Sequence, residues 1–150
     1  MNTWLTALIL GLLVALASPA QTQEHNPVVL AMLGKASLEL ELAQTPAARY
    51  KGLSGRCQGL APGRGMAFVY PYRDRWGMVM RDMRFALDFV WVRTGVVVGV
   101  TPQVPPPRPG EAPIEVSPPT DVDIVLELPA GWAATHGVYK GAPLVFFPRP

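Results

Sequence analysis

At 150 residues the chain has the length of a single domain, and it can bury a proper core after an N-terminal segment is removed. The 17 prolines and 14 glycines argue for many turns and against long helices. The net charge of +2 conceals a basic middle, because residues 49–93 carry nine basic and three acidic side chains. A basic patch for an anionic partner is one interpretation. We favour the interpretation that the arginines are scattered over a solvated surface, because the basic residues are not consecutive. We expect no nucleic-acid partner, because no nucleic-acid-binding motif is present.

Residues 1–20 are typical of a signal peptide. An apolar run over residues 4–17 is followed by Ser18, Pro19 and Ala20, small residues of the kind read by a signal peptidase. We therefore expect export to the periplasm or the cell exterior, with membrane contact only through this segment. An uncleaved short anchor is the alternative, because no Lys or Arg precedes the apolar run.

Residues 21–35 form a lead-in without a clear structural pattern. Residues 36–43 then alternate apolar and acidic side chains, which predicts a half-buried strand. Thr45 followed by Pro46 predicts the start of a short helix over residues 47–51. Further strands are expected at residues 65–70, 96–100, 123–128 and 143–147, with a hairpin turn at residues 93–95, and a second short helix is expected at residues 133–135.

Residues 76–92 combine long apolar side chains with four charges: Arg81, Asp82, Arg84 and Asp88. In a single strand, successive side chains alternate between faces, so each face would mix charged and apolar groups. A charge among apolar groups must be paired, solvated at the mouth of a cavity, or functional. We therefore expect the functional site in this stretch.

The segment 102–119 contains eight prolines, and it is either a linker or a functional surface loop. We favour the loop, because too little chain follows it for a second domain. The expected fold is mostly β: a single small β-barrel or β-sandwich domain over residues 36–150, with six to eight short strands and two short helices.

Several segments, taken in order, resemble the family named domain of unknown function 192. They are residues 45–53 with Arg56, residues 65–70, residues 80–82 with residues 87–92, and residues 125–131. The resemblance covers roughly residues 38–147. It implies a small, mostly β domain, often behind a signal peptide, without an agreed biochemical activity.

The chain departs from the family's pattern at two places. The usual run of methionine, basic residue, asparagine and threonine is Met80, Arg81, Asp82 and Met83 here, and Ala86 replaces the usual proline. Many members have two cysteines and an aromatic residue where this chain is rich in proline. If that loop closes the family's site, the resemblance implies an altered site in this chain.

Arg81 and Asp88 are the strongest candidates for the site. A guanidinium and a carboxylate on one apolar strand form either a ligand clamp or a structural ion pair. With Arg56 and Asp82 they make a set that can grip an anionic or polyhydroxy ligand. Trp76 offers a stacking face, although such a residue more often belongs to a core or an interface.

Catalysis has little support in the sequence, and no catalytic residue is assigned. His25 and His136 belong to no recognisable triad, and with Cys57 they lack metal-ligand spacing, so neither a metal nor a cofactor is expected. Cys57 cannot form an internal disulfide, because it is the only cysteine. It is either a reactive thiol beside Arg56 or a simply buried side chain.

These observations favour a monomeric, non-enzymatic binding or accessory module of the cell envelope. Its ligand is expected to be a small or polymeric glycan or anion, bound by Arg56, Trp76, Arg81, Asp82 and Asp88. The alternative is a hydrolase or transferase acting on envelope saccharides, with Asp82 or Asp88 as acid or base. A third possibility is a structural subunit whose apolar strand edge pairs with a partner.

Overall fold

The computed structural model describes residues 25–147, so the signal segment expected at residues 1–20 lies outside the described residues. The described part of the chain forms nine strands and two short helices. The strands are β1 (Val28–Leu33), β2 (Ala36–Ala43), β3 (Arg64–Asp74), β4 (Met78–Val79), β5 (Leu87–Arg93), β6 (Val96–Val104), β7 (Glu115–Val116), β8 (Val122–Pro129) and β9 (Leu144–Phe147). The helices are α1 (Pro46–Lys51) and α2 (Trp132–Thr135). Neither helix has the length and apolar character needed to cross a membrane.

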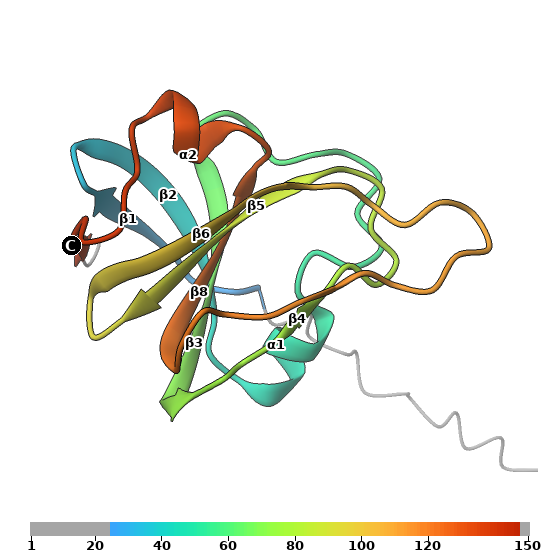
Figure 1. Cartoon of the computed structure of the whole chain (residues 1–150), viewed down its shortest axis with the longest axis horizontal. Coiled ribbons are helices and arrows are strands. Elements are labelled where there is room, and N and C mark those ends of the chain that lie inside the picture. The colour runs from blue at the N-terminus through green and yellow to red at the C-terminus, as the bar shows by residue number, and fades with distance from the viewer. Residues whose placement is uncertain (1–24, 148–150) are drawn as a thin grey trace, which may run out of the picture.

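Seven strands form one curled sheet in the order β6-β5-β8-β3-β2-β1-β9, in which only β2 and β3 run parallel (Figure 1). The curl brings the starts of β6 and β9 together. The amide of Val97 donates to the carbonyl of Ala142 at 2.9 Å, and that of Leu144 to Gly95 at 2.8 Å. The mostly β class expected from the sequence is confirmed, in the form of a half-barrel.

Apolar side chains pack on both faces of this sheet. The inner core draws on all seven strands and on α2: Ala31, Leu33, Leu38, Leu40, Ala67, Val90, Val92, Val97, Leu126, Leu128, Trp132, Ala133, Ala142 and Leu144. The outer core lies on the opposite face: Ala43, Leu53, Met66, Phe68, Met78, Met80, Met83, Leu87, Phe89, Trp91, Val104, Val116, Val122 and Val125. Because β5 contributes alternate residues to both cores, its sequence is an almost unbroken apolar run.

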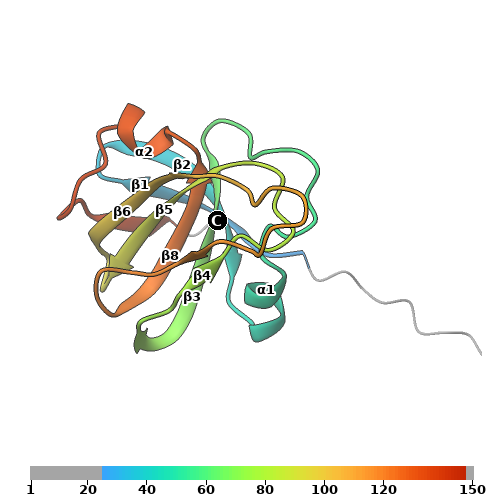
Figure 2. The same ribbon diagram turned by 45° about the vertical axis from the view of Figure 1, so that its right-hand side comes forward.

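The two helices serve different cores. In both views α2 and α1 lie at opposite sides of the molecule (Figures 1 and 2). α2 contributes buried Trp132 and Ala133 to the inner core, whereas α1 lies beside the outer core. The loops that follow α1 and β6 extend beyond the sheet on the side of the outer core, which is the side that carries the cavity described below.

Several local predictions are confirmed. β2 covers residues 36–43 as its alternation indicates. α1 begins after Thr45, whose side chain accepts a hydrogen bond from the Ala48 amide at 3.1 Å. The β5–β6 turn consists of Thr94 and Gly95, with φ of 51° and 74°, the pair of positive values that a two-residue hairpin turn requires.

Two segments have structure that the sequence pattern did not define. The lead-in contains β1, which pairs with β2 along its whole length. Residues 76–92 are two separate strands, because β4 leaves the main sheet and pairs with β7 from the proline-rich segment. That segment also supplies buried Val104 and Val116 to the outer core, so it packs against the domain.

Gly65 permits the close approach of three strands beneath the site. A Cβ atom at this position on β3 would lie 2.5 Å from Leu128 Cδ2 and 2.8 Å from the Glu127 carbonyl on β8. It would also lie 3.0 Å from Leu40 Cδ2 on β2. A glycine is therefore needed where β3 passes between β2 and β8.

Candidate functional site

Asp88 is buried and bound by backbone amides alone. Its Oδ1 accepts from Gln103 at 2.8 Å and from Gly131 at 2.9 Å, and its Oδ2 accepts from Ala133 at 2.9 Å. The side chain is 0% exposed. Asp88 therefore joins β5 to the end of β6 and to the start of α2, and it does not line the cavity described below.

Arg56 forms a two-point ion pair with Glu41 on β2, at 2.9 and 2.6 Å. The hydrogen bond from Arg56 lowers the pKa of Glu41, and the same bond raises the pKa of Arg56. The pair attaches the loop after α1 to the main sheet.

Trp76 and Asp82 also have local roles. The Trp76 ring stacks on Tyr70 with centroids 4.3 Å apart, and its Nε1 donates to the Tyr72 carbonyl at 3.0 Å. Asp82 is exposed, and its carbonyl accepts from the Gly55 amide at 2.9 Å. Of the five residues that the sequence nominated, only Arg81 lines the cavity below α1.

This cavity of about 140 Å³ lies between α1, β3 and the β4 segment, with β8 at its base. Its apolar lining includes Leu53, Phe68, Met78 and Met83. Its cationic lining consists of Arg49 and Lys51 from α1 and Arg81 from the loop after β4. The cavity therefore combines an apolar wall with a positively charged rim.

The base of the cavity carries the carboxyl group of Glu127. Strand register places Glu41, Met66, Glu127 and Phe89 in one row across β2, β3, β8 and β5, on the face of the outer core. The Glu127 side chain is 5% exposed, and its Oε2 has no hydrogen-bond partner among the described residues.

Burial of this group raises the pKa of Glu127 to about 8, with the nearby Arg56 acting in the opposite direction. At neutral pH the carboxyl is therefore protonated. Leaving a buried polar atom without a partner is costly, so a carboxyl group with such an atom, on a residue that lines a cavity, indicates a binding or catalytic site.

The two rim arginines are held by neutral groups. Arg81 Nη2 donates to the Tyr50 carbonyl at 2.6 Å, and its guanidinium carbon lies 4.1 Å from the centre of the Tyr50 ring. Arg49 Nη1 donates to the Val69 carbonyl at 2.9 Å, and its guanidinium lies over Tyr70. None of the ion pairs seen within residues 25–147 involves Arg49, Lys51 or Arg81.

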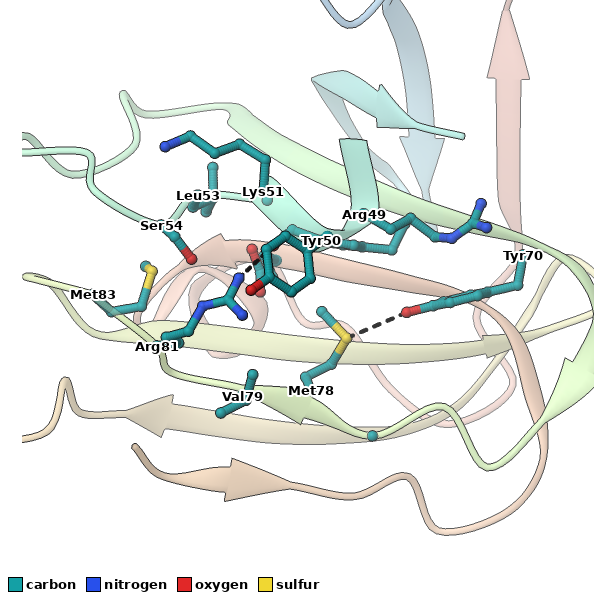
Figure 3. A pocket seen from close by; sticks show the side chains of 14 residues that line it. Arg49, Tyr50, Lys51, Leu53, Ser54, Tyr70, Met78, Val79, Arg81 and Met83 are labelled. Atoms are coloured by element: carbon teal, nitrogen blue, oxygen red, sulfur yellow. Dashed lines mark hydrogen bonds between the residues drawn. The ribbon is translucent and has the colours of Figure 1, made fainter. Parts of the chain in front are cut away.

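Figure 3 shows how these side chains are directed. Arg81 lies against Tyr50 in the middle of the view, Arg49 extends toward Tyr70, and Lys51 points away from Arg81. The Tyr70 hydroxyl donates to the Met78 sulfur at 3.7 Å, and burial raises the pKa of Tyr70. Arg81 is therefore the cation best placed to contact a ligand, and the other two add to the positive potential.

Sequence reasoning missed Glu127, Arg49 and Lys51. In β8 the alternation of Glu127 with Leu126 and Leu128 is typical of a solvent-facing carboxylate. The informative signal is the neighbouring strand β5, whose almost unbroken apolar run indicates that both faces of the sheet are covered.

Other features offer less chemistry. A hollow of about 470 Å³ beside the β1–β2 turn is lined by exposed side chains, including Lys35, His136 and Tyr139. Cys57 is exposed, with Arg84 Nη1 at 3.5 Å from its sulfur, so the interpretation of Cys57 as a simply buried side chain is wrong. Within the part of the chain that is described, no three His, Cys, Asp or Glu side chains gather to hold a metal ion.

The fold and the site together define a small half-barrel domain with a cation-rimmed cavity above a buried carboxyl group. The chain belongs to the DUF192 family, described as Uncharacterized ACR, which it matches over residues 28–146. No curated protein matches it.

Two crystal structures resemble this fold. One is a protein from Sinorhizobium meliloti 1021 described as a proposed transcription regulator, with 29% identity and a TM-score of 0.71 over 81% of this chain and 95% of that one. The other is a protein of unknown function from Novosphingobium aromaticivorans DSM 12444, with 27% identity and a TM-score of 0.66 over 79% and 84%.

Proposed function

We propose that the chain is an exported, non-enzymatic binding module of the cell envelope that holds a small anionic group in the cavity below α1. The supporting observation is the rim, which Arg49, Lys51 and Arg81 line and where none of the observed ion pairs neutralises them. A cation placed to contact a ligand, with two more beside it and an apolar wall below, favours an anion with a short apolar body.

The cavity volume limits the size of the part of the ligand that the cavity encloses. An engineered protein cavity of about 150 Å³ holds benzene, so about 140 Å³ corresponds to roughly six non-hydrogen atoms. A complete sugar ring with its hydroxyls is larger. An acidic glycan would therefore insert one carboxylate-bearing substituent, and a free short-chain carboxylate would enter whole.

Calorimetric titration of the purified protein with acetate, propionate and butyrate tests this proposal. A second arm uses a soluble acidic envelope glycan, which distinguishes a polymer substituent from a free ligand. We expect Arg81→Ala to weaken binding by at least about tenfold, because it removes a charge-assisted hydrogen bond. Arg108→Ala is the matched control, because its side chain is 85% exposed and lies outside the cavity. Failure of every anion to bind in the millimolar range would refute the proposal.

The enzymatic alternative rests on a different residue from those the sequence suggested. Asp88 is occupied by three amides and Asp82 is exposed on a loop, whereas Glu127 is a protonated carboxyl in a cavity, as a general acid requires. Turnover of an envelope saccharide that is lost in Glu127→Gln but kept in Glu115→Gln would favour the hydrolase or transferase. Saturable binding without turnover would favour the binding module.

A further inference from the structure

Resting on that proposed function, we propose that Glu127 recognises the far end of the ligand by donating a hydrogen bond, so that the preferred ligand is a short-chain carboxylate bearing a terminal hydroxyl or carbonyl oxygen. The carboxylate faces the rim, and the second oxygen reaches the base of the cavity.

The first argument is the position of Glu127. Among the residues that line the cavity, Glu127 is the buried one with an ionisable side chain. Its Oε2 lacks a hydrogen-bond partner within the described residues. A ligand without a polar group at this end leaves that atom unsatisfied, whereas one with an oxygen there satisfies it. The site should therefore discriminate strongly between two ligands that differ by a single hydroxyl.

The second argument is the protonation state. Because burial raises the pKa of Glu127 to about 8, the carboxyl is neutral at pH 7 and can donate its proton in a hydrogen bond. A neutral group also avoids repulsion of an anion bound a few atoms away. An ionised carboxylate at the base would instead select a donor such as an ammonium group.

The third argument is the charge of the rim. A ligand that ends in an ammonium group would pass Arg49, Lys51 and Arg81, and it would lose its hydration shell before it reached Glu127. The walls between rim and base include Phe68, Met78 and Met83, which suit a short apolar chain. The rim and the walls thus favour a terminal oxygen over an amine.

Three probes of one chain length test this inference: butyrate, 4-hydroxybutyrate and 4-aminobutyrate. Competition titration at pH 6.5 should show that the wild type binds 4-hydroxybutyrate about tenfold more tightly than butyrate, the difference expected for one buried hydrogen bond. Glu127→Leu should bind both equally, and Glu127→Gln should keep the preference, because its amide also donates. Glu115→Gln should behave as the wild type does, because the Glu115 side chain on β7 is exposed.

The pH dependence supplies a second readout. Binding of both butyrate and 4-hydroxybutyrate to the wild type should weaken above pH 8, where ionised Glu127 repels the bound anion, and binding to Glu127→Gln should not change in this way. This comparison remains informative if Glu127→Leu fails to fold.

The possible failures are distinguishable. If none of the three probes binds, the proposed function fails, and this inference fails with it. If butyrate and 4-hydroxybutyrate bind the wild type equally, or Glu127→Leu keeps the preference, only the role of Glu127 is refuted. Tightest binding of 4-aminobutyrate with release of a proton would show that Glu127 acts as an ionised acceptor, and would overturn the inference.

Discussion

Asp88 shows how a charge can be buried without a counter-ion. Its two oxygens accept three backbone amides at 2.8–2.9 Å. We expect Asp88→Asn to lower the free energy of unfolding by about 2–3 kcal/mol, because the amide group offers one acceptor oxygen and turns a donor toward donors. Urea denaturation measures this as a lower midpoint with an unchanged slope. Asp82→Asn is the control and should stay within about 0.5 kcal/mol, because Asp82 is exposed. Equal midpoints for the two variants would contradict the structural role of Asp88.

Glu127 should make the free energy of unfolding fall as the pH rises. Its pKa is about 8 in the folded protein, against an ordinary value of 4.5, so between these values the folded state holds a proton that the unfolded state has released. The contribution of Glu127 is therefore fully present below about pH 4.5 and is lost as the pH rises toward 8. The free energy of unfolding should fall by about 1.4 kcal/mol per pH unit from this group alone.

Denaturation of the wild type and Glu127→Gln at pH 5, 6, 7 and 8 checks this dependence. The two proteins should diverge as the pH rises, with Glu127→Gln losing less stability, because glutamine has no proton to release. Parallel pH profiles would show that Glu127 has an ordinary pKa. Glu115→Gln should follow the wild type, since that residue is exposed.

At the scale of elements, α1 controls the rim of the cavity. It has six residues and contributes Arg49, Tyr50 and Lys51 to the lining, and the Thr45 side chain caps its start. We expect Thr45→Ala to destabilise this helix by about 1 kcal/mol. The result should be faster hydrogen exchange at the α1 amides and weaker anion binding, with little change in global unfolding. Thr45→Ser keeps the cap and should behave as the wild type does; unchanged exchange in Thr45→Ala would show that the cap is dispensable.

The elements also show which sequence patterns carry structural information. The alternation in β2 and the cap-and-proline start of α1 are local signals, and both predictions are confirmed. β1 has no such alternation, and its apolar run becomes a strand through pairing with β2 and β9. The separation of β4 from β5 depends on the pairing of β4 with β7, about 35 residues away. Contacts of that kind are not encoded by periodicity, so the cavity they enclose was not predictable from the sequence.

The candidate site, too, was only partly predictable, because it depends on contacts between distant segments. The sequence placed it in residues 76–92, and Arg81 does line the cavity. The carboxyl-bearing residue that lines this cavity is Glu127 and not Asp88, because the curl of the sheet and the outer core decide which carboxyl faces the cavity. Both carboxylates lie in apolar strands, and only the three-dimensional structure distinguishes the one satisfied by amides from the one that lacks a partner.

At the scale of the whole molecule, one sheet supports two cores. Adjacent residues of β5 belong to different cores, with Val90 and Val92 in the inner core and Phe89 and Trp91 in the outer core. β8 is shared in the same way, through Leu126 and Val125. Loss of packing on one face would therefore displace the strands that support the other face. We expect the two cores to unfold together, in one cooperative transition.

Tryptophan fluorescence can test this coupling, because Trp91 lies in the outer core and Trp132 in the inner core. Two variants, each retaining one of these tryptophans and carrying phenylalanine at the other tryptophan positions, would be unfolded in urea. In each variant the fluorescence midpoint should coincide with the circular dichroism midpoint. Because both midpoints are measured on the same protein, the effect of the substitutions on stability does not enter the comparison. A Trp91 signal that changes at lower urea than the circular dichroism would show that the outer layer detaches first. In that case α1, the β4–β7 pair and the cavity would form a separately folding layer, and ligand binding would stabilise that layer more than the half-barrel beneath it.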